Sequence, residues 1–157
     1  MSYKIEYSHK GKISGRFELP ASKSISNRVL IINALSGSDK SVANLAKCDD
    51  TDVMVKALTS DSHLVDIGAA GTSMRFLTAY LSIKSGEWII TGSQRMKERP
   101  IQILVDALRS IGADIEYAEN EGFPPLEIRG KEIEGGDVEI DGSVSSQYIS
   151  ALMMIAP

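Results

Sequence analysis

Two kinds of spacing alternate along the chain: short apolar stretches typical of strands, and longer stretches in which apolar residues recur every three or four positions, as in helices. The helical spacing is clear where Ile25, Val29 and Ile32 repeat ahead of Ser36–Gly37, a left-handed stop. The predicted helices are residues 24–35, 49–58, 71–83, 100–111 and 145 onward. The predicted strands are residues 12–19, 41–46, 63–67, 87–91, 114–117, 126–129 and 138–140.

This alternation predicts an α/β fold. The strands are short and are separated both by helices and by tight turns such as Asp141–Gly142. We therefore expect a repeated unit of helices lying over small sheets rather than one long doubly wound sheet. The sequence stops at Ala156–Pro157 inside an apolar stretch, which we interpret as part of a longer protein. A short protein that ends on a core helix is the alternative.

Composition narrows the class of protein. The 157 residues are 43% hydrophobic and 24% charged, which is ordinary for a single globular domain and excludes disorder as the main state. The formal net charge of −4 argues against nucleic acid as a partner. No apolar run reaches the ~18 residues of a membrane span. The single cysteine, Cys48, fits the reducing cytoplasm. His9 and His63 lie far apart without a Cys/His cluster, so we expect no metal.

Three predicted helix starts follow a strand and are rich in small and hydroxyl residues. They are residues 20–28 (PASKSISNR), 68–75 (GAAGTSMR) and 141–147 (DGSVSSQ). The free N–H groups and the dipole of a helix start favour an anion.

Basic residues strengthen this hypothesis at two of the starts. Lys23, Arg28 and Arg75 add positive charge there, and Ser24 lies one helical turn before Arg28 on the same face. Simple helix capping by Ser and Thr is the alternative. The helix that starts at residues 49–52 carries three Asp residues, which cap and repel anions, so the contrast favours phosphate binding at the other starts.

A further basic patch, residues 94–100, holds Arg95, Lys97 and Arg99 just after a strand. Such a run is often a solvated loop, but the end of a strand is also where α/β proteins bind ligands. The stretch 68–71 lacks the Lys of a nucleotide-binding P-loop, so no nucleotide cofactor is indicated. Neither histidine has a hydrolase signature around it.

Taken in order, four motifs closely resemble the EPSP synthase (3-phosphoshikimate 1-carboxyvinyltransferase) family: LPASKSISNR, GTSMR, RMKERP and DGSVSSQY. The resemblance covers about residues 15–157. It implies two lobes of repeated βαβαββ units, an inside-out α/β barrel fold, with the active site between the lobes. Residues 1–19 would then be a strand segment of the other lobe, and residues 20–157 part of a substrate-binding lobe with about two units.

The activity implied by this resemblance is transfer of the enolpyruvyl group of phosphoenolpyruvate to shikimate 3-phosphate, with release of phosphate. This is a step of the shikimate pathway toward chorismate and the aromatic amino acids. The resemblance also implies a monomeric cytoplasmic enzyme that needs no cofactor. The family's acidic catalytic residue and several basic phosphoenolpyruvate ligands lie beyond Pro157, so we expect this chain alone to bind substrate without turnover.

Site residues are carried over motif by motif. Lys23 resembles the residue that contacts both substrates and takes part in proton transfer. The implied contacts of shikimate 3-phosphate are Lys23, Ser24, Arg28, Ser145, Ser146 and Gln147. The implied contacts of phosphoenolpyruvate are Lys23, Gly71, Arg95 and Gln147.

Two departures and two alternatives remain. Ala69 stands where the family often has Asn, and the stretch 59–65 is shorter than expected. The sister UDP-N-acetylglucosamine 1-carboxyvinyltransferase family uses a cysteine near the Arg95 region, but residues 92–97 contain none, and we expect Cys48 to be a small buried residue. The other alternative is a non-catalytic phosphate-binding module.

Overall fold

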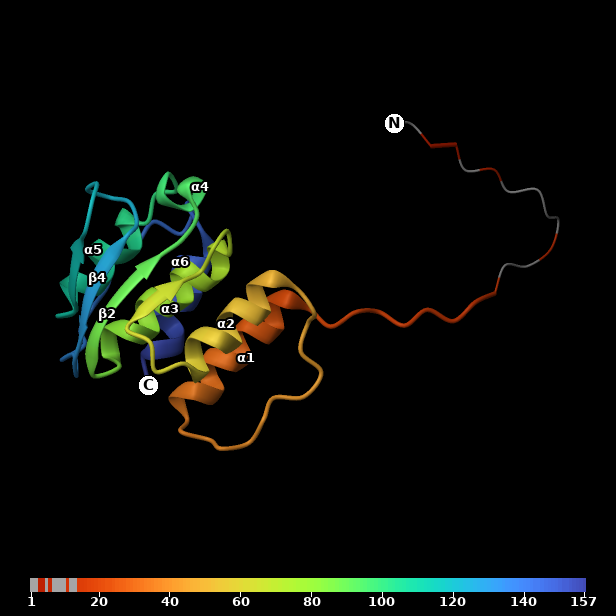
Figure 1. The fold of residues 1–157 in the computed structure, drawn as a ribbon, viewed down its shortest axis with the longest axis horizontal. Coiled ribbons are helices and arrows are strands. Elements are labelled where there is room, and N and C mark those ends of the chain that lie inside the picture. Colours follow the sequence, from red (N-terminus) through yellow and green to blue (C-terminus); the bar gives the residue numbers. More distant parts are fainter. Residues whose placement is uncertain (1–2, 5, 7–10, 12–13) are drawn as a thin grey trace.

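A mixed four-stranded sheet organises the part of the chain that the computed structural model describes, residues 3–4, 6, 11 and 14–157 (Figure 1). The strands lie in the order β1-β2-β4-β3. β1 runs parallel to β2, while β4 is antiparallel to both β2 and β3. Their bounds are β1 Leu64–Asp66, β2 Gly86–Thr91, β3 Asp114–Tyr117 and β4 Leu126–Gly130.

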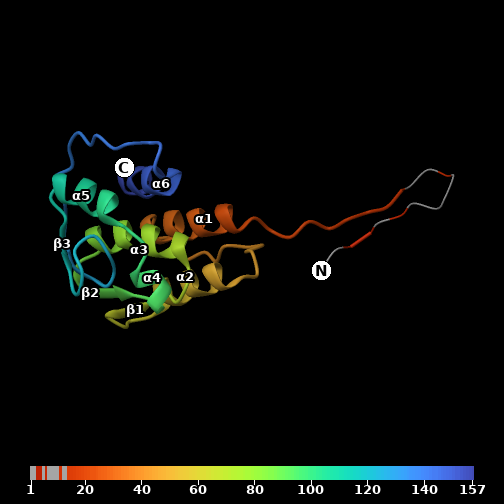
Figure 2. The same cartoon turned by 90° about the horizontal axis from the view of Figure 1, so that it is seen from above.

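Helices pack against one face of this sheet (Figure 2). α3 is central: it contacts β4 on one side and α1, α2 and α6 on the others, so nearly all its residues are buried. The helices are α1 Lys23–Leu35, α2 Asp49–Thr59, α3 Gly71–Ile83, α4 Gln94–Lys97, α5 Gln102–Ser110 and α6 Ser146–Ile155.

The core lies between the sheet and α3. Along β4, Leu126 and Ile128 are buried while Glu127 is exposed, as expected when one face of a sheet is covered. Phe76 and Leu77 of α3 are fully buried in the core, and each such side chain contributes roughly 1.5–3 kcal/mol of hydrophobic stabilisation. These packed layers fix where the helix starts lie.

The predicted α/β class is confirmed. The order β1-α3-β2-α4-α5-β3-β4 corresponds to one βαβαββ unit in which the short α4 precedes α5. The sheet is small, as expected from short strands. The predicted helix at residues 71–83 has these bounds in the structure: it begins after a turn at residues 68–69 and ends where the backbone of the C-cap Lys84 becomes extended.

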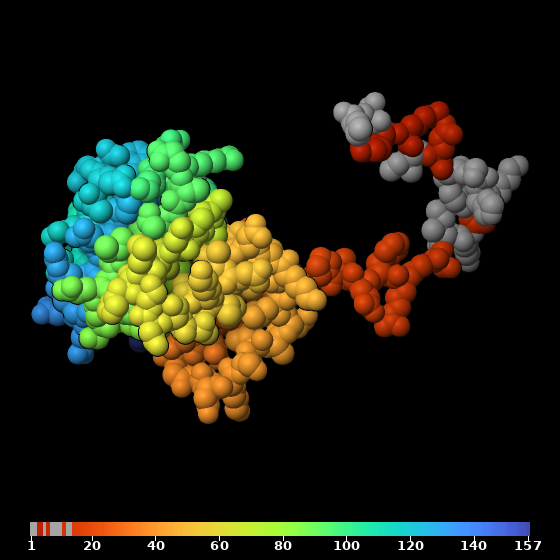
Figure 3. Space-filling view, viewed as in Figure 1, coloured from red at the N-terminus to blue at the C-terminus, as the bar shows by residue number. Residues whose placement is uncertain are grey.

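Two predicted strands at the beginning of the chain are wrong. Of residues 12–19, positions 12 and 13 lie outside the described residues. Residues 14–19 form no strand and extend away from the helices, with Phe17 and Leu19 more than four-fifths exposed (Figures 1 and 3). Residues 41–46 are irregular because Asn44 has φ 54° and because the Ser26 hydroxyl, not a strand, accepts from Ala46 N–H at 2.9 Å.

Three corrections concern the later half. Residues 138–140 form no strand; they follow Gly135 and Gly136, both at positive φ, on the way from β4 to α6. Pro100 does not begin a helix, since α5 starts at Gln102 after the N-cap Ile101. The basic patch contains the short helix α4, which was not predicted.

Candidate functional site

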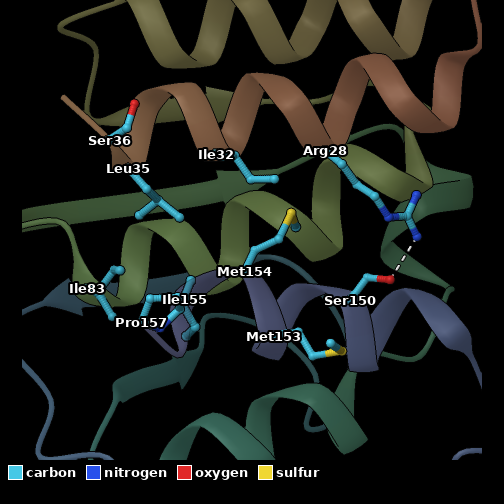
Figure 4. Close-up of a pocket in the computed structure, with 10 residues that line it drawn as sticks. All are labelled: Arg28, Ile32, Leu35, Ser36, Ile83, Ser150, Met153, Met154, Ile155 and Pro157. Carbon is cyan, nitrogen blue, oxygen red and sulfur yellow. Dashed lines mark hydrogen bonds between the residues drawn. The ribbon is translucent and has the colours of Figure 1, made fainter. Parts of the chain in front are cut away.

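The starts of α1, α3 and α6 are joined by side-chain hydrogen bonds. Arg28 Nη2 of α1 donates to Ser150 Oγ of α6 at 2.8 Å, a contact drawn in Figure 4. Gln147 Nε2 at the start of α6 donates to Thr72 Oγ1 of α3 at 3.2 Å. The three hydroxyl-rich helix starts of the sequence are therefore neighbours in space.

At the start of α1, the serine that caps the helix and the serine predicted to bind an anion are different residues. Ser22 is the N-cap, and its hydroxyl accepts from Ile25 N–H at 3.4 Å. Ser24 is left free of capping, and its hydroxyl and carbonyl both accept from Arg28 Nη1. The Arg28 guanidinium also lies 5.2 Å from the centre of the Phe76 ring. Ser24 and Arg28 do share one helix face, as predicted.

Lys23 faces an acidic neighbour that the sequence analysis treated only as a helix cap. Its Nζ lies 3.6 Å from Asp50 Oδ1 in the first turn of α2. The Asp50 carbonyl accepts from the buried Ser73 hydroxyl at 2.9 Å, which joins the starts of α2 and α3. This contact fixes the backbone of Asp50 relative to α3.

The expected capping of α2 by aspartates is wrong. The N-cap is Cys48, and no side chain caps this helix. The three aspartates lie in the first turn, where they face the positive end of the dipole instead. Cys48 is half-buried, not buried as expected, and its Sγ lies 3.4 Å from Thr51 Oγ1.

The start of α3 carries no side-chain cap, since its N-cap is Ala70. Arg75, only 8% exposed, donates to the Gly71 carbonyl at 2.7 Å and lies 5.3 Å from the centre of the Tyr148 ring. Its buried Nε has no hydrogen-bond partner. An uncapped helix start with a buried cation beside it favours an anion.

Gly71 provides space rather than a special backbone conformation. It is not among the glycines with positive φ. A Cβ at this position would collide with the Arg99 guanidinium and lie 3.1 Å from Arg75 Nη1. Because residue 71 has no side chain, the Arg99 guanidinium can lie close to the backbone at the start of α3.

Hydrogen bonds within residues 141–147 order the approach to α6. Ser143 N–H donates to Asp141 Oδ1 at 2.8 Å, and hydrogen bonding from Ser143 lowers the pKa of the Asp141 carboxyl. Ser145 is the N-cap of α6, and its hydroxyl accepts from Gln147 N–H at 3.3 Å. Ser146 remains exposed beside it. Capping thus accounts for one of the two predicted serines and leaves the other available.

Two hollows border these helices and differ in chemistry. A polar hollow of about 410 Å³ is lined by Ala69, Ser93, Arg95, Met96 and Arg99. A larger hollow of about 730 Å³ lies between α1 and α6, and its lining past Arg28 and Ser150 is mainly aliphatic and Met side chains (Figure 4). A multiply charged anion fits the first, because guanidinium groups can pair with it.

The predicted residues thus form two neighbouring groups. Ser24 and Arg28 belong with α6, while Gly71 belongs with the hollow that contains Arg95. Lys23 joins neither group and lies instead beside Asp50 of α2. Sequence reasoning missed Thr72 as the partner of Gln147, because that contact spans 75 positions. It also missed that Asp50 lies beside Lys23 and that Arg99 lies against Gly71. For Thr72, one signal was available: it follows Gly71 directly in the same motif.

Within the described part of the chain, no group of three or more His, Cys, Asp or Glu side chains could hold a metal ion. None of the helices described has the length and apolar character needed to cross a membrane.

Comparison with known proteins identifies relatives of this arrangement. The family model described as EPSP synthase (3-phosphoshikimate 1-carboxyvinyltransferase) matches residues 8–60 and 57–157. A 3-phosphoshikimate 1-carboxyvinyltransferase of Bacteroides fragilis is 62% identical over 146 residues, covering 93% of this chain and 36% of the relative. One of Haemophilus influenzae is 45% identical over 183 residues, covering 98% of this chain and 42% of the relative.

Solved structures agree on the fold. An EPSP synthase of Acinetobacter baumannii superposes with a TM-score of 0.77 at 22% identity, over 89% of this chain and 38% of that one. The chain therefore spans about two-fifths of the length of the curated relatives it matches.

Proposed function

The chain belongs to the EPSP synthase family, and from this we propose that the whole protein transfers the enolpyruvyl group of phosphoenolpyruvate to shikimate 3-phosphate. The observation that carries the proposal is the joining of three anion-favouring helix starts by Arg28–Ser150 and Gln147–Thr72. Both substrates are multiply charged anions, and helix starts with basic side chains suit them.

The phosphate of shikimate 3-phosphate is bound, in this proposal, between the starts of α1 and α6. Ser24 and Arg28 approach from α1, and Ser145, Ser146 and Gln147 approach from α6. Arg28 already bridges the two helices through Ser24 and Ser150, so its guanidinium is oriented before a ligand arrives. Preformed geometry of this kind lowers the entropy lost on binding.

Phosphoenolpyruvate is bound in this proposal at the start of α3, with Gly71, Arg95, Gln147 and Lys23 as contacts. A hydroxyl of shikimate 3-phosphate adds to the enol carbon while the neighbouring methylene carbon takes up a proton. The attacking hydroxyl gives up its own proton as its oxygen bonds to carbon, and the methylene carbon becomes a methyl group. The tetrahedral intermediate then loses one proton of this methyl group and expels phosphate, which restores the double bond. Lys23 contacts both substrates and moves a proton, with Asp50 at 3.6 Å orienting its ammonium group.

We extend the proposal to the organisation of the whole protein. Residues 20–157 form part of one lobe with about two βαβαββ units, and residues 1–19 belong to a second lobe that supplies the remaining phosphoenolpyruvate ligands. The enzyme is a cytoplasmic monomer. Catalysis by positioning requires both substrates to be held between the two lobes.

The test compares the full-length gene product with the 157-residue chain. The full-length protein is expected to release phosphate only when both substrates are present. The chain alone is expected to show no turnover but to bind shikimate 3-phosphate, with amide shifts at the starts of both α1 and α6. Shifts confined to one start, or a full-length protein that prefers UDP-N-acetylglucosamine as acceptor, would contradict the proposal.

A further inference from the structure

We propose that Arg99 is an additional anion-binding residue at the start of α3, acting on the same small anion as Gly71 and Arg95. The inference rests on the proposed function, and it adds a residue that the motif comparison does not assign. Arg99 follows α4 and lines the polar hollow together with Arg95 and Ala69.

The position of the Arg99 guanidinium is the first observation. It occupies the space beside the first residue of α3, where a Cβ on Gly71 would collide with Nη1. The hollow formed by Ala69, Ser93, Arg95 and Met96 opens at the same place. Arg99 therefore reaches both the helix start and the hollow.

The second observation is that no acidic side chain in the described part of the chain pairs with Arg99. Among residues 14–157, none of the ion pairs involves Arg95 or Arg99. Lys97, in the same basic patch, instead pairs with Glu119 at 2.6 Å. The patch thus divides into one neutralised cation and two arginines that face a hollow.

The charges around the start of α3 favour an anion there. A cation near the N-terminus of a helix opposes the helix dipole, and α3 has no side-chain cap to offset it. Arg75 adds a nearly buried guanidinium whose Nε is without a hydrogen-bond partner. The guanidinium groups of Arg99 and Arg75 both lie beside the first residue of α3, and an anion between them would offset their repulsion.

The chemistry of that anion follows from the donors. Planar guanidinium groups match carboxylate and phosphate oxygens in pairs. Phosphoenolpyruvate carries both groups, whereas the phosphate of shikimate 3-phosphate is assigned above to α1 and α6. Arg99 therefore contributes to binding of phosphoenolpyruvate and not of its co-substrate.

The test uses the full-length protein with Arg99→Ala and Arg99→Lys, and Lys97→Ala as the matched control from the same patch. Arg99→Ala should raise the KM for phosphoenolpyruvate roughly 10- to 100-fold, the loss of one charge-assisted contact. The KM for shikimate 3-phosphate and the Tm should stay unchanged. Arg99→Lys should recover part of the loss, and Lys97→Ala should match the wild type.

The outcomes separate the two proposals. If the wild type turns over and Arg99→Ala leaves the KM for phosphoenolpyruvate unchanged, Arg99 is not a ligand although the proposed function stands. If the wild type does not turn over, the proposed function fails, and inorganic phosphate becomes the probe, titrated against the amide signals of Gly71 and Thr72. Weaker phosphate binding in Arg99→Ala then supports the assignment, and equal binding overturns it.

Discussion

Replacing Gly71 by Ala should separate stability from binding. Gly71 is the first residue of α3 and does not have positive φ, so alanine fits its backbone without strain. Alanine in a helix is favoured over glycine by roughly 0.5–1 kcal/mol. The atom that collides with the new methyl group is the end of the exposed Arg99 side chain, which can move away. The free energy of unfolding should therefore stay constant or rise by up to about 1 kcal/mol.

Binding of the small anion should weaken in the same variant. The methyl group fills the approach to the uncapped helix start and displaces the Arg99 guanidinium. Losing one hydrogen bond to a charged group costs about 1.5–3 kcal/mol, which corresponds to a KM for phosphoenolpyruvate raised roughly 10- to 150-fold. The KM for shikimate 3-phosphate should stay unchanged, because its proposed contacts lie on α1 and α6.

The assay is urea unfolding together with both Michaelis constants, measured on the same full-length variant. Gly112→Ala is the control, since Gly112 has φ +100° with open space around its Cα; that variant should lose stability and keep both constants. If Gly71→Ala instead behaves like the control, residue 71 serves only the backbone and our explanation of it is wrong.

Three further predictions concern single side chains. Arg28→Ala should weaken binding of shikimate 3-phosphate by about 1.5–3 kcal/mol in a calorimetric titration, with less effect at high salt; equal affinity would exclude Arg28 as a ligand. Thr72→Val should weaken substrate binding by roughly 0.5–1.5 kcal/mol, because Gln147 loses its contact with the Thr72 hydroxyl, whereas Thr72→Ser should keep that contact. Equal KM values for the two variants would show that Thr72 does not position Gln147. Burial raises the pKa of Tyr117 to about 12, so the unfolded state ionises first and stability should fall as pH rises from about 10 toward 12. Tyr117→Phe should lack this loss in urea unfolding across that range, and should be no less stable at pH ~7 because the buried hydroxyl has no hydrogen-bond partner.

Local spacing predicted the elements whose neighbours are close in sequence. The apolar periodicity of α3 predicts a helix and the short apolar run of β4 predicts a strand. Both predictions hold because the two elements bury their apolar side chains against each other. Residues 14–19 alternate just as a strand does, but a strand also needs a hydrogen-bonded neighbour, and their sequence does not reveal whether one is present.

The candidate site was predictable in residue type but not in contact. Hydroxyl and basic residues at helix starts indicated an anion, and the structure brings those starts together. No local pattern could indicate that Gln147 reaches Thr72 or that Asp50 faces Lys23, since these contacts depend on how the helices pack. The reason for glycine at position 71 also lies outside its own motif, because the side chain that a Cβ would meet belongs to Arg99.

The contacts of α6 with both α1 and α3 have a thermodynamic consequence. Its first two turns bond to Arg28 through Ser150 and to Thr72 through Gln147, so one short helix touches both proposed anion positions. An anion that orders the α6 start from either side leaves less conformational freedom for the other anion to remove. Affinities for the two anions should then be linked, and linkage is reciprocal: the factor by which one improves binding of the second equals the factor in the opposite direction.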